Sequence, residues 1–178
     1  MTPWRKLSVR TCALVAACSL SAHAAGIEDS STPAQVVGLF MQSCMRFVGD
    51  ASGLRQWAAR SGLRLLPEQG QRAFLYGLPG EVFDASSQDS KLVLISQNGG
   101  SCSALAESAN GAAVISTLEQ VMQVSHIDFT VTREGDDAVE KVLHHKEYSA
   151  SHSGRRWQML VSIVKGATAG EVMLTANP

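Results

Sequence analysis

Three histidines towards the C-terminal end, His144, His145 and His152, are the cluster that most suggests a metal site. The first two fall in a segment typical of a β-strand, in which neighbouring side chains point to opposite faces. They cannot converge on one ion without a bulge, and no cysteine or carboxylate stands at a recognised metal-ligand spacing beside them. We therefore predict exposed or hydrogen-bonded surface histidines, with no bound metal and no cofactor.

A candidate polar patch lies on the same predicted strand, where His144, Lys146 and Tyr148 share one face. With Arg155 or Arg156 across the following turn, these side chains would bind an anionic group. The alternative is a solvated sheet face whose side chains pair across strands. The patch is kept as a candidate binding site.

Signatures of covalent catalysis are missing from the sequence. A triad of Ser86, His144 and Asp84 can be drawn, but there is no Gly-x-Ser-x-Gly elbow and no Ser-x-x-Lys pair. Turn and strand-end roles explain Asp84 and Ser86 better, because such side chains bond nearby backbone groups. The glycines at 99 and 100 are not a phosphate loop, since no lysine or helix N-terminus follows at the needed spacing. No catalytic residue is predicted.

The leading functional hypothesis is a non-enzymatic binding or protein-interaction module. One alternative is a hydrolase or other enzyme with an unrecognised site, and another is an inhibitor or immunity protein that protects against a secreted effector. An enzyme should contain a deep pocket with convergent polar groups, whereas an interaction protein should expose an apolar patch or a sheet edge.

The N-terminus predicts export. Arg5, Lys6 and Arg10 form a basic region, an uncharged apolar stretch follows, and Ala22-His23-Ala24 is a small-x-small cleavage site. The apolar stretch is too short to remain as a transmembrane anchor. We therefore predict a signal peptide over residues 1–24, a flexible leader over 25–33 and a single domain over 34–178, located in a bacterial periplasm.

A second way of processing the N-terminus stays open. Val15-Ala16-Ala17-Cys18 resembles a lipobox, in which the cysteine is lipidated and becomes the mature N-terminus. Cleavage near Ala24 is favoured because the apolar run before Cys18 is at the short limit for an export signal. Lipidation at Cys18 would place the protein on the outer membrane through a lipid anchor.

Charge disfavours two classes of partner. After residue 24 the chain has 12 basic and 16 acidic residues, and nucleic-acid binding needs a basic stripe. No polybasic run or basic amphipathic helix indicates a membrane-surface role. The expected partner is an unidentified protein or small ligand.

Two cysteines, Cys44 and Cys102, remain after removal of the predicted signal. An oxidising compartment allows one intramolecular pairing of these two residues. The chain-entropy relation assigns about 4 kcal/mol to a bridge of this span. A structural disulfide is favoured over free thiols or a redox role, because no Cys-x-x-Cys pair is present.

The first half of the chain has helical spacing. Apolar residues from Val36 to Val48, including Cys44, form one stripe of a helix that Gly49 ends. Asp50 can cap a second helix that closes at Gly62, and Pro67 opens a short third one through about residue 76.

The second half is predicted to be mostly strands. Short strands over 81–85, 92–96 and 101–105 include a hairpin around Asn98-Gly99-Gly100, and a helix follows over 109–124. Strands at 127–132, 139–150, 157–164 and 171–175 are separated by turns at 134–137, 151–154 and 165–170. Short turns imply antiparallel pairing.

Together these elements predict an α+β domain in which the N-terminal helices pack on one face of an antiparallel sheet made of a β-hairpin, a helix and a four-strand meander. This order of elements is compatible with a profilin-like or PAS-like layer.

Several phrases resemble a family of small exported bacterial proteins and lipoproteins described as hypothetical, one group of which is neisserial. The phrases are Leu54-x-x-Trp57-Ala58, Leu66-Pro67, Gly80-x-Val82-Phe83-Asp84-Ala85-Ser86, Cys102-Ser103, His144-x-x-x-Tyr148 and Gly154-Arg155-x-Trp157. The resemblance covers about residues 34–165. It implies export and a single domain, and it assigns no activity and no site residue.

Overall fold

The computed structural model describes residues 32–166 and 169–178. The predicted signal peptide, Cys18 and the leader up to residue 31 lie outside the described residues. The described elements, in chain order, are α1 (Thr32–Phe40), the π-helix η1 (Met41–Met45), α2 (Ala51–Arg60), β1 (Arg64–Leu65), α3 (Glu68–Leu75), β2 (Gly80–Asp84), β3 (Leu92–Gln97), β4 (Cys102–Ala109), α4 (Gly111–Val124), β5 (Asp128–Asp136), β6 (Leu143–His152), β7 (Arg155–Val164) and β8 (Gly170–Asn177).

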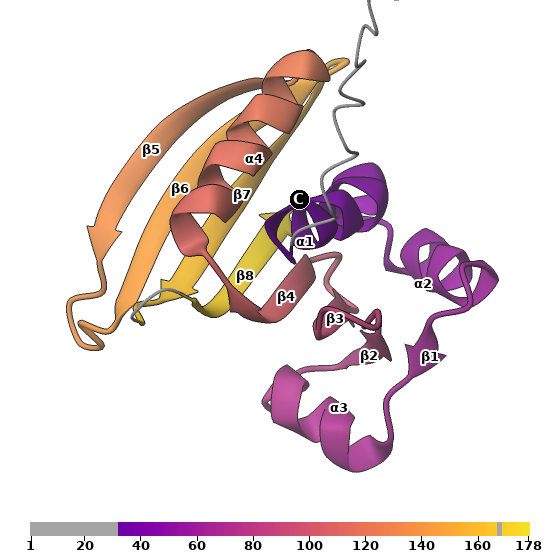
Figure 1. The fold of residues 1–178 in the computed structure, drawn as a ribbon. Helices are drawn as coiled ribbons and strands as arrows, with labels where there is room; N and C mark the ends of the chain where they lie inside the picture. Colours follow the sequence, from indigo (N-terminus) through magenta and orange to yellow (C-terminus); the bar gives the residue numbers. More distant parts are fainter. Residues whose placement is uncertain (1–31, 167–168) are drawn as a thin grey trace, which may run out of the picture.

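All eight described strands belong to one antiparallel sheet with the order β1-β2-β3-β4-β8-β7-β6-β5 (Figure 1). The predicted α+β class and the C-terminal four-strand meander are confirmed. Helix α4 carries the chain from β4 to the far edge at β5, and the meander then returns until β8 pairs with β4. The pairing of β4 with β8 therefore joins the two halves of the chain into one sheet.

One face of the sheet, called here the inner face, is covered by α1, η1 and α4, which lie side by side in front of the strands in Figure 1. Their buried side chains continue the core that the strands supply from Phe83 to Ala176. Helix α2 joins the same core through Leu54 and Ala58, and the Asp50 carboxylate caps it by accepting a hydrogen bond from the Gly53 amide at 2.9 Å. The helical stripes predicted from the sequence are the ones that are buried.

Helix α3 differs from the expectation that the N-terminal helices share one face. Its Leu75 packs with Val82 and Ile95 in a second, smaller cluster, whereas Phe83 and Leu94 belong to the main core. Neighbouring strand residues point to opposite faces, so α3 covers the other face, called here the outer face. The physical reason is the continuous apolar run of β3, which leaves apolar side chains on both faces to be covered.

The predicted turn at 134–137 is wrong by about three residues. Strand β5 continues through Asp136, which pairs with His144, and β6 begins only at Leu143. The Asp137 carboxylate organises the actual turn by accepting hydrogen bonds from the Val139 and Glu140 amides, both at 2.8 Å. Aspartate is favoured at the start of such a turn, and the sequence has two adjacent aspartates, Asp136 and Asp137, either of which could have begun it.

The turn between β6 and β7 was placed correctly, and it is the two-residue loop Ser153-Gly154 with positive φ at both positions. This geometry matches the twist of the flanking strands. Strand β1, which has two residues, was not predicted, and it pairs with β2 at one edge of the sheet.

Candidate functional site

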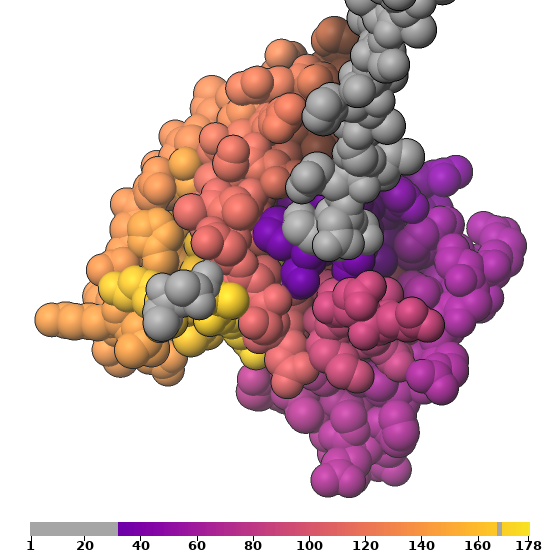
Figure 2. Space-filling model, viewed as in Figure 1, coloured from indigo at the N-terminus to yellow at the C-terminus, as the bar shows by residue number. Residues whose placement is uncertain are grey.

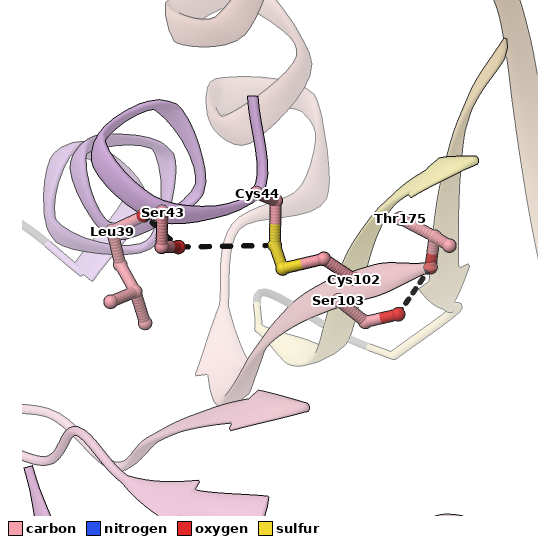
Figure 3. The surroundings of a disulfide bond; sticks show 6 residues. All are labelled: Leu39, Ser43, Cys44, Cys102, Ser103 and Thr175. Atoms are coloured by element: carbon pink, nitrogen blue, oxygen red, sulfur yellow. Dashed lines mark hydrogen bonds between the residues drawn. A yellow bond between two sulfur atoms is a disulfide. The ribbon is translucent and has the colours of Figure 1, made fainter. Parts of the chain in front are cut away.

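The predicted disulfide between Cys44 and Cys102 is confirmed (Figure 3). Its Cα atoms are 5.1 Å apart, and the two residues are 0% and 1% exposed. Cys44 comes from η1 and Cys102 is the first residue of β4, so the bridge ties the N-terminal helical segment to the centre of the sheet. A thiolate attacking a substrate needs access, which this buried bridge does not have. The disulfide is therefore a structural link.

The three histidines occupy separate places. His144 Nδ1 lies 3.1 Å from an Asp136 carboxylate oxygen, His145 Nδ1 lies 3.0 Å from the Ser162 hydroxyl, and His152 Nδ1 donates to the His126 carbonyl at 3.1 Å. Hydrogen bonds from Lys165 and then from His144 hold the pKa of Asp136 below its usual range. Within residues 32–166 and 169–178, no three metal-ligating side chains come together in a way that could hold an ion.

Lys146 and Tyr148 do come together, but beneath α4 and around a glutamate. The buried Tyr148 hydroxyl donates to Glu119 Oε1 at 2.8 Å, and Lys146 Nζ lies 3.1 Å from the same oxygen and 3.2 Å from Glu134. Burial, followed by the hydrogen bond to Glu119, raises the pKa of the Tyr148 phenol far above its usual range. Burial alone would lower the pKa of Lys146, but hydrogen bonds with Glu119 and Glu134 together raise it. The charge of Lys146 is therefore already neutralised by this chain's own carboxylates.

The two arginines do not complete a patch with these residues. Arg155 Nη2 donates to the Val48 carbonyl at 2.8 Å, near the end of the first helical segment. Arg156 pairs with Ser151, which is three residues from Tyr148 and therefore points to the opposite face of the strand. Arg156 thus lies on the outer face. The five residues predicted as one surface are thus divided between the two faces of the sheet and along the length of β6 and β7.

The triad drawn from Ser86, His144 and Asp84 is not assembled. The Ser86 amide donates to Asp84 Oδ1 at 3.0 Å, and hydrogen bonds from Ser86, with a smaller contribution from Arg64, lower the pKa of the Asp84 carboxyl. Asp84 ends β2, whereas His144 is on β6, five strand positions away. At the usual strand spacing this separation is about 24 Å. Asp84 and Ser86 therefore have the turn role that the sequence indicated.

A groove that sequence reasoning missed lies on the outer face, between α3 and strands β3, β4 and β8. Its volume is about 410 Å³, within the usual range for ligand sites. Its floor is apolar, and its rim carries polar and charged side chains. The floor consists of Leu66, Phe74, Val93 and Leu105, and the rim consists of Asp84, Ser86, Lys91, Glu107 and Glu171.

The segment that forms one wall of the groove also exposes apolar side chains elsewhere. We call residues 64–79, which contain β1 and α3, the α3 lobe, and Figure 2 shows α3 projecting from the rest of the molecule. A second hollow of about 300 Å³ shares Leu66 and Asp84 with the groove and extends to Leu65. Leu65, Tyr76 and Leu78 are 52%, 88% and 54% exposed. The lobe thus forms a wall of the groove and also carries three exposed apolar side chains outside it.

One sequence signal could have located the groove. The third helix carries apolar residues on one side while β3 is apolar on both faces, so a helix on the second face follows from the pattern. The sequence does not show that one helix of eight residues is too short to cover the outer face as far as β4 and β8. The groove begins where this cover ends.

No helix in the part of the chain that the structure describes is long and apolar enough to cross a membrane. No family model, curated protein or solved structure matches the chain. The resemblance to small exported bacterial proteins and the profilin-like or PAS-like layer therefore stay predictions.

Proposed function

We propose that this chain is an exported, non-enzymatic binding or protein-interaction module that binds its partner through the groove between α3 and the outer face of the sheet. The observation that carries the proposal is the apolar floor of the groove, which consists of the partly exposed Leu66, Phe74 and Val93 and the nearly buried Leu105. Ligand sites typically combine such an apolar lining with a few polar groups that fix orientation.

The distribution of exposed apolar side chains supports the same surface. Seven large apolar residues are exposed in the described part of the chain, and three of them, Leu65, Tyr76 and Leu78, lie in the α3 lobe. Single exposed apolar residues are ordinary, but three in the one segment that also forms a wall of an apolar groove are typical of an interaction site. Leu65 and Leu78 are already about half buried, so covering either one against a partner contributes about half of the roughly 1.5–3 kcal/mol of a fully buried leucine.

The strands beneath the groove are held in place by the sheet and by the disulfide. Strand β4 carries Leu105 on the outer face, Cys102 begins the same strand, and the disulfide ties Cys102 to the helical segment on the inner face. Binding to a preorganised surface avoids the entropy cost of ordering it.

The proposal of export rests on the basic N-terminal region and Ala22-His23-Ala24. The close approach of Cys44 and Cys102 supports it, because structural disulfides form in oxidising compartments. Intact-mass measurement on periplasmic protein should show the loss of residues 1–24. A lipidated N-terminal Cys18 would keep export but change the processing site, and a full-length cytoplasmic product would contradict export.

Peptide-display selection against the oxidised mature chain tests the groove. Val93→Arg places a charge on the groove floor at a half-buried position, and Val124→Arg makes the same change at a residue that is 70% exposed at the end of α4. Enriched binders should lose at least about tenfold in affinity for the Val93 variant and keep their affinity for the Val124 variant.

A second variant protects this test from a folding artefact. If Val93→Arg lowers the melting temperature markedly, Leu66→Arg replaces it, because Leu66 lines both the groove and the adjoining hollow and belongs to the α3 lobe rather than to a central strand. Binders that respond equally to the changes at positions 93 and 124, or a selection that enriches nothing, would contradict the proposed site.

A further inference from the structure

The charges on the rim of the groove distinguish its partner. Asp84 is already engaged, because Arg64 Nη2 lies 2.9 Å from its carboxylate. Glu107 and Glu171 directly follow and precede the paired residues Ala106 and Val172 of β4 and β8. Both glutamates are exposed, and neither forms an ion pair with any residue that the structure describes.

The register between β4 and β8 shifts between Ala106 and Ala109, so Glu107 and Glu171 are neighbours across a bulge, where their like charges still repel. The single amine on this rim, Lys91, lies opposite Glu107 on the neighbouring strand, where its carbonyl accepts a hydrogen bond from the Glu107 amide at 3.1 Å. The charges that remain after the pairing of Asp84 are therefore two negative and one positive, with Glu171 the carboxylate farther along the rim from Lys91. The pairing of Asp84 with Arg64 leaves Glu107 and Glu171 as the carboxylates available to a partner. A cation placed between them would relieve their repulsion while its neighbouring apolar groups cover the floor.

The sheet edge opposite the α3 lobe is a poorer place for a partner. Strand β5 is nine residues long, but it has a bulge between Val131 and Arg133 and carries charges along its length. Both features hinder the pairing of an additional strand. The strands beneath the groove, β3, β4 and β8, each have neighbours on both sides, so a partner must lie across their face.

We infer that the groove accepts a short segment of a partner polypeptide in which a large apolar side chain stands next to lysine or arginine. The apolar side chain lies on the floor, against Phe74, Val93 and Leu105, and the basic side chain contacts Glu107 and Glu171. This inference rests on the proposed function, because it names the chemistry of the segment that the same groove binds. Arginine suits the site best, since its planar guanidinium contacts two carboxylates with fixed geometry.

Three fluorescent peptides test the inference on the oxidised mature chain. They share a central Leu-Phe and are flanked by two arginines, two glutamines or two glutamates, and their binding is measured by fluorescence anisotropy at low salt and at about 0.5 M salt. The arginine peptide should bind about tenfold more tightly than the glutamate peptide at low salt, and added salt should reduce this difference.

Charge variants locate the effect. In a Glu107→Gln, Glu171→Gln protein the preference for arginine should fall to about twofold or less. A control with Asp128→Asn and Glu140→Gln removes two exposed charges elsewhere and should keep the preference, which separates a local contact from the overall field of the protein.

The outcomes separate this inference from the proposed function. If all three peptides bind equally and Val93→Arg abolishes their binding, the groove is a binding site but the basic segment is wrong. If the preference for arginine is lost equally in the control variant, the contact with Glu107 and Glu171 is wrong. If no peptide binds, or if Val93→Arg has no effect on any of them, both the inference and the proposed groove are overturned.

Discussion

Reduction of the Cys44–Cys102 bridge should destabilise the fold strongly without unfolding it at room temperature. The bridge joins residues separated by 58 positions, and the chain-entropy relation assigns about 4 kcal/mol to a loop of this length. For a domain of about 150 residues, each 1 kcal/mol shifts the melting temperature by roughly 2–4 °C. We therefore expect reduction to lower the melting temperature by about 10 °C, because the unfolded chain regains the freedom that the bridge removes.

The assay compares three states of the mature protein by thermal and urea unfolding. Oxidised and reduced wild type contain the same atoms apart from the bridge, so their difference measures the cross-link without any loss of packing. The Cys44→Ala, Cys102→Ala variant should be less stable still, since both side chains are buried, and dithiothreitol should not change its unfolding curve.

Two results would contradict a stabilising Cys44–Cys102 bridge. The first is a pair of freely alkylatable thiols in native protein purified from the periplasm. The second is a reduced protein that melts within about 2 °C of the oxidised one, which would mean that the bridge does not constrain the unfolded chain.

Two other predictions test the packing beneath α4 and the turn beside the disulfide. In an alkaline titration followed by phenolate absorbance, Tyr148 should stay protonated until the protein unfolds, because burial and then the hydrogen bond to Glu119 raise the pKa of its phenol. Folding raises the pKa of the Tyr148 phenol, so its contribution to stability is fully present below the unfolded value of about 10 and is lost as pH rises beyond that value. Tyr148→Phe should therefore flatten the alkaline loss of stability, and ionisation of the Tyr148 phenol in the folded protein would contradict this. Gly100→Ala should lower the free energy of unfolding in urea by roughly 1–3 kcal/mol, because Gly100 has a φ of 90° and an added Cβ would lie 2.8 Å from the Cα atom of Gly49. The control Gly99→Ala should cost less than about 0.5 kcal/mol, because nothing lies within 4 Å of an added Cβ there. Equal costs for the two variants would contradict this explanation.

The elements whose signals are local were predictable from the sequence. The helical stripe through Val36 and Phe40 predicted a buried face, and Asp50 predicted the start of α2, because spacing and capping depend only on nearby residues. Cys44 was placed on that buried stripe and Cys102 beyond a hairpin turn, and their pairing followed from the compartment expected for an exported chain.

Features that depend on which strands become neighbours were not predictable. The sequence put Lys146 and Tyr148 on one face of a strand, which is correct, but it did not show that α4 would bring Glu119 over them. A set of side chains that looks like an open cationic patch in the sequence is instead a neutralised, mostly covered cluster. Arg156 was assigned to the wrong set because the predicted patch did not commit to a register across the turn.

The groove was missed for the same kind of reason. Glu107 and Glu171 are 64 positions apart in the chain, and they meet only because β8 pairs with β4. No local sequence pattern predicts the pairing of β8 with β4, because that pairing depends on the path of the whole C-terminal meander.

Amide chemical-shift mapping tests most directly whether the groove beside α3 is the binding site. The isotopically labelled, oxidised mature protein is titrated with the arginine-flanked peptide. The largest saturable shifts should fall on five groove residues that come from four elements: Phe74, Val93, Leu105, Glu107 and Glu171. Saturable shifts confined to α4 or β5, with these five amides unmoved, would contradict the groove as the binding site.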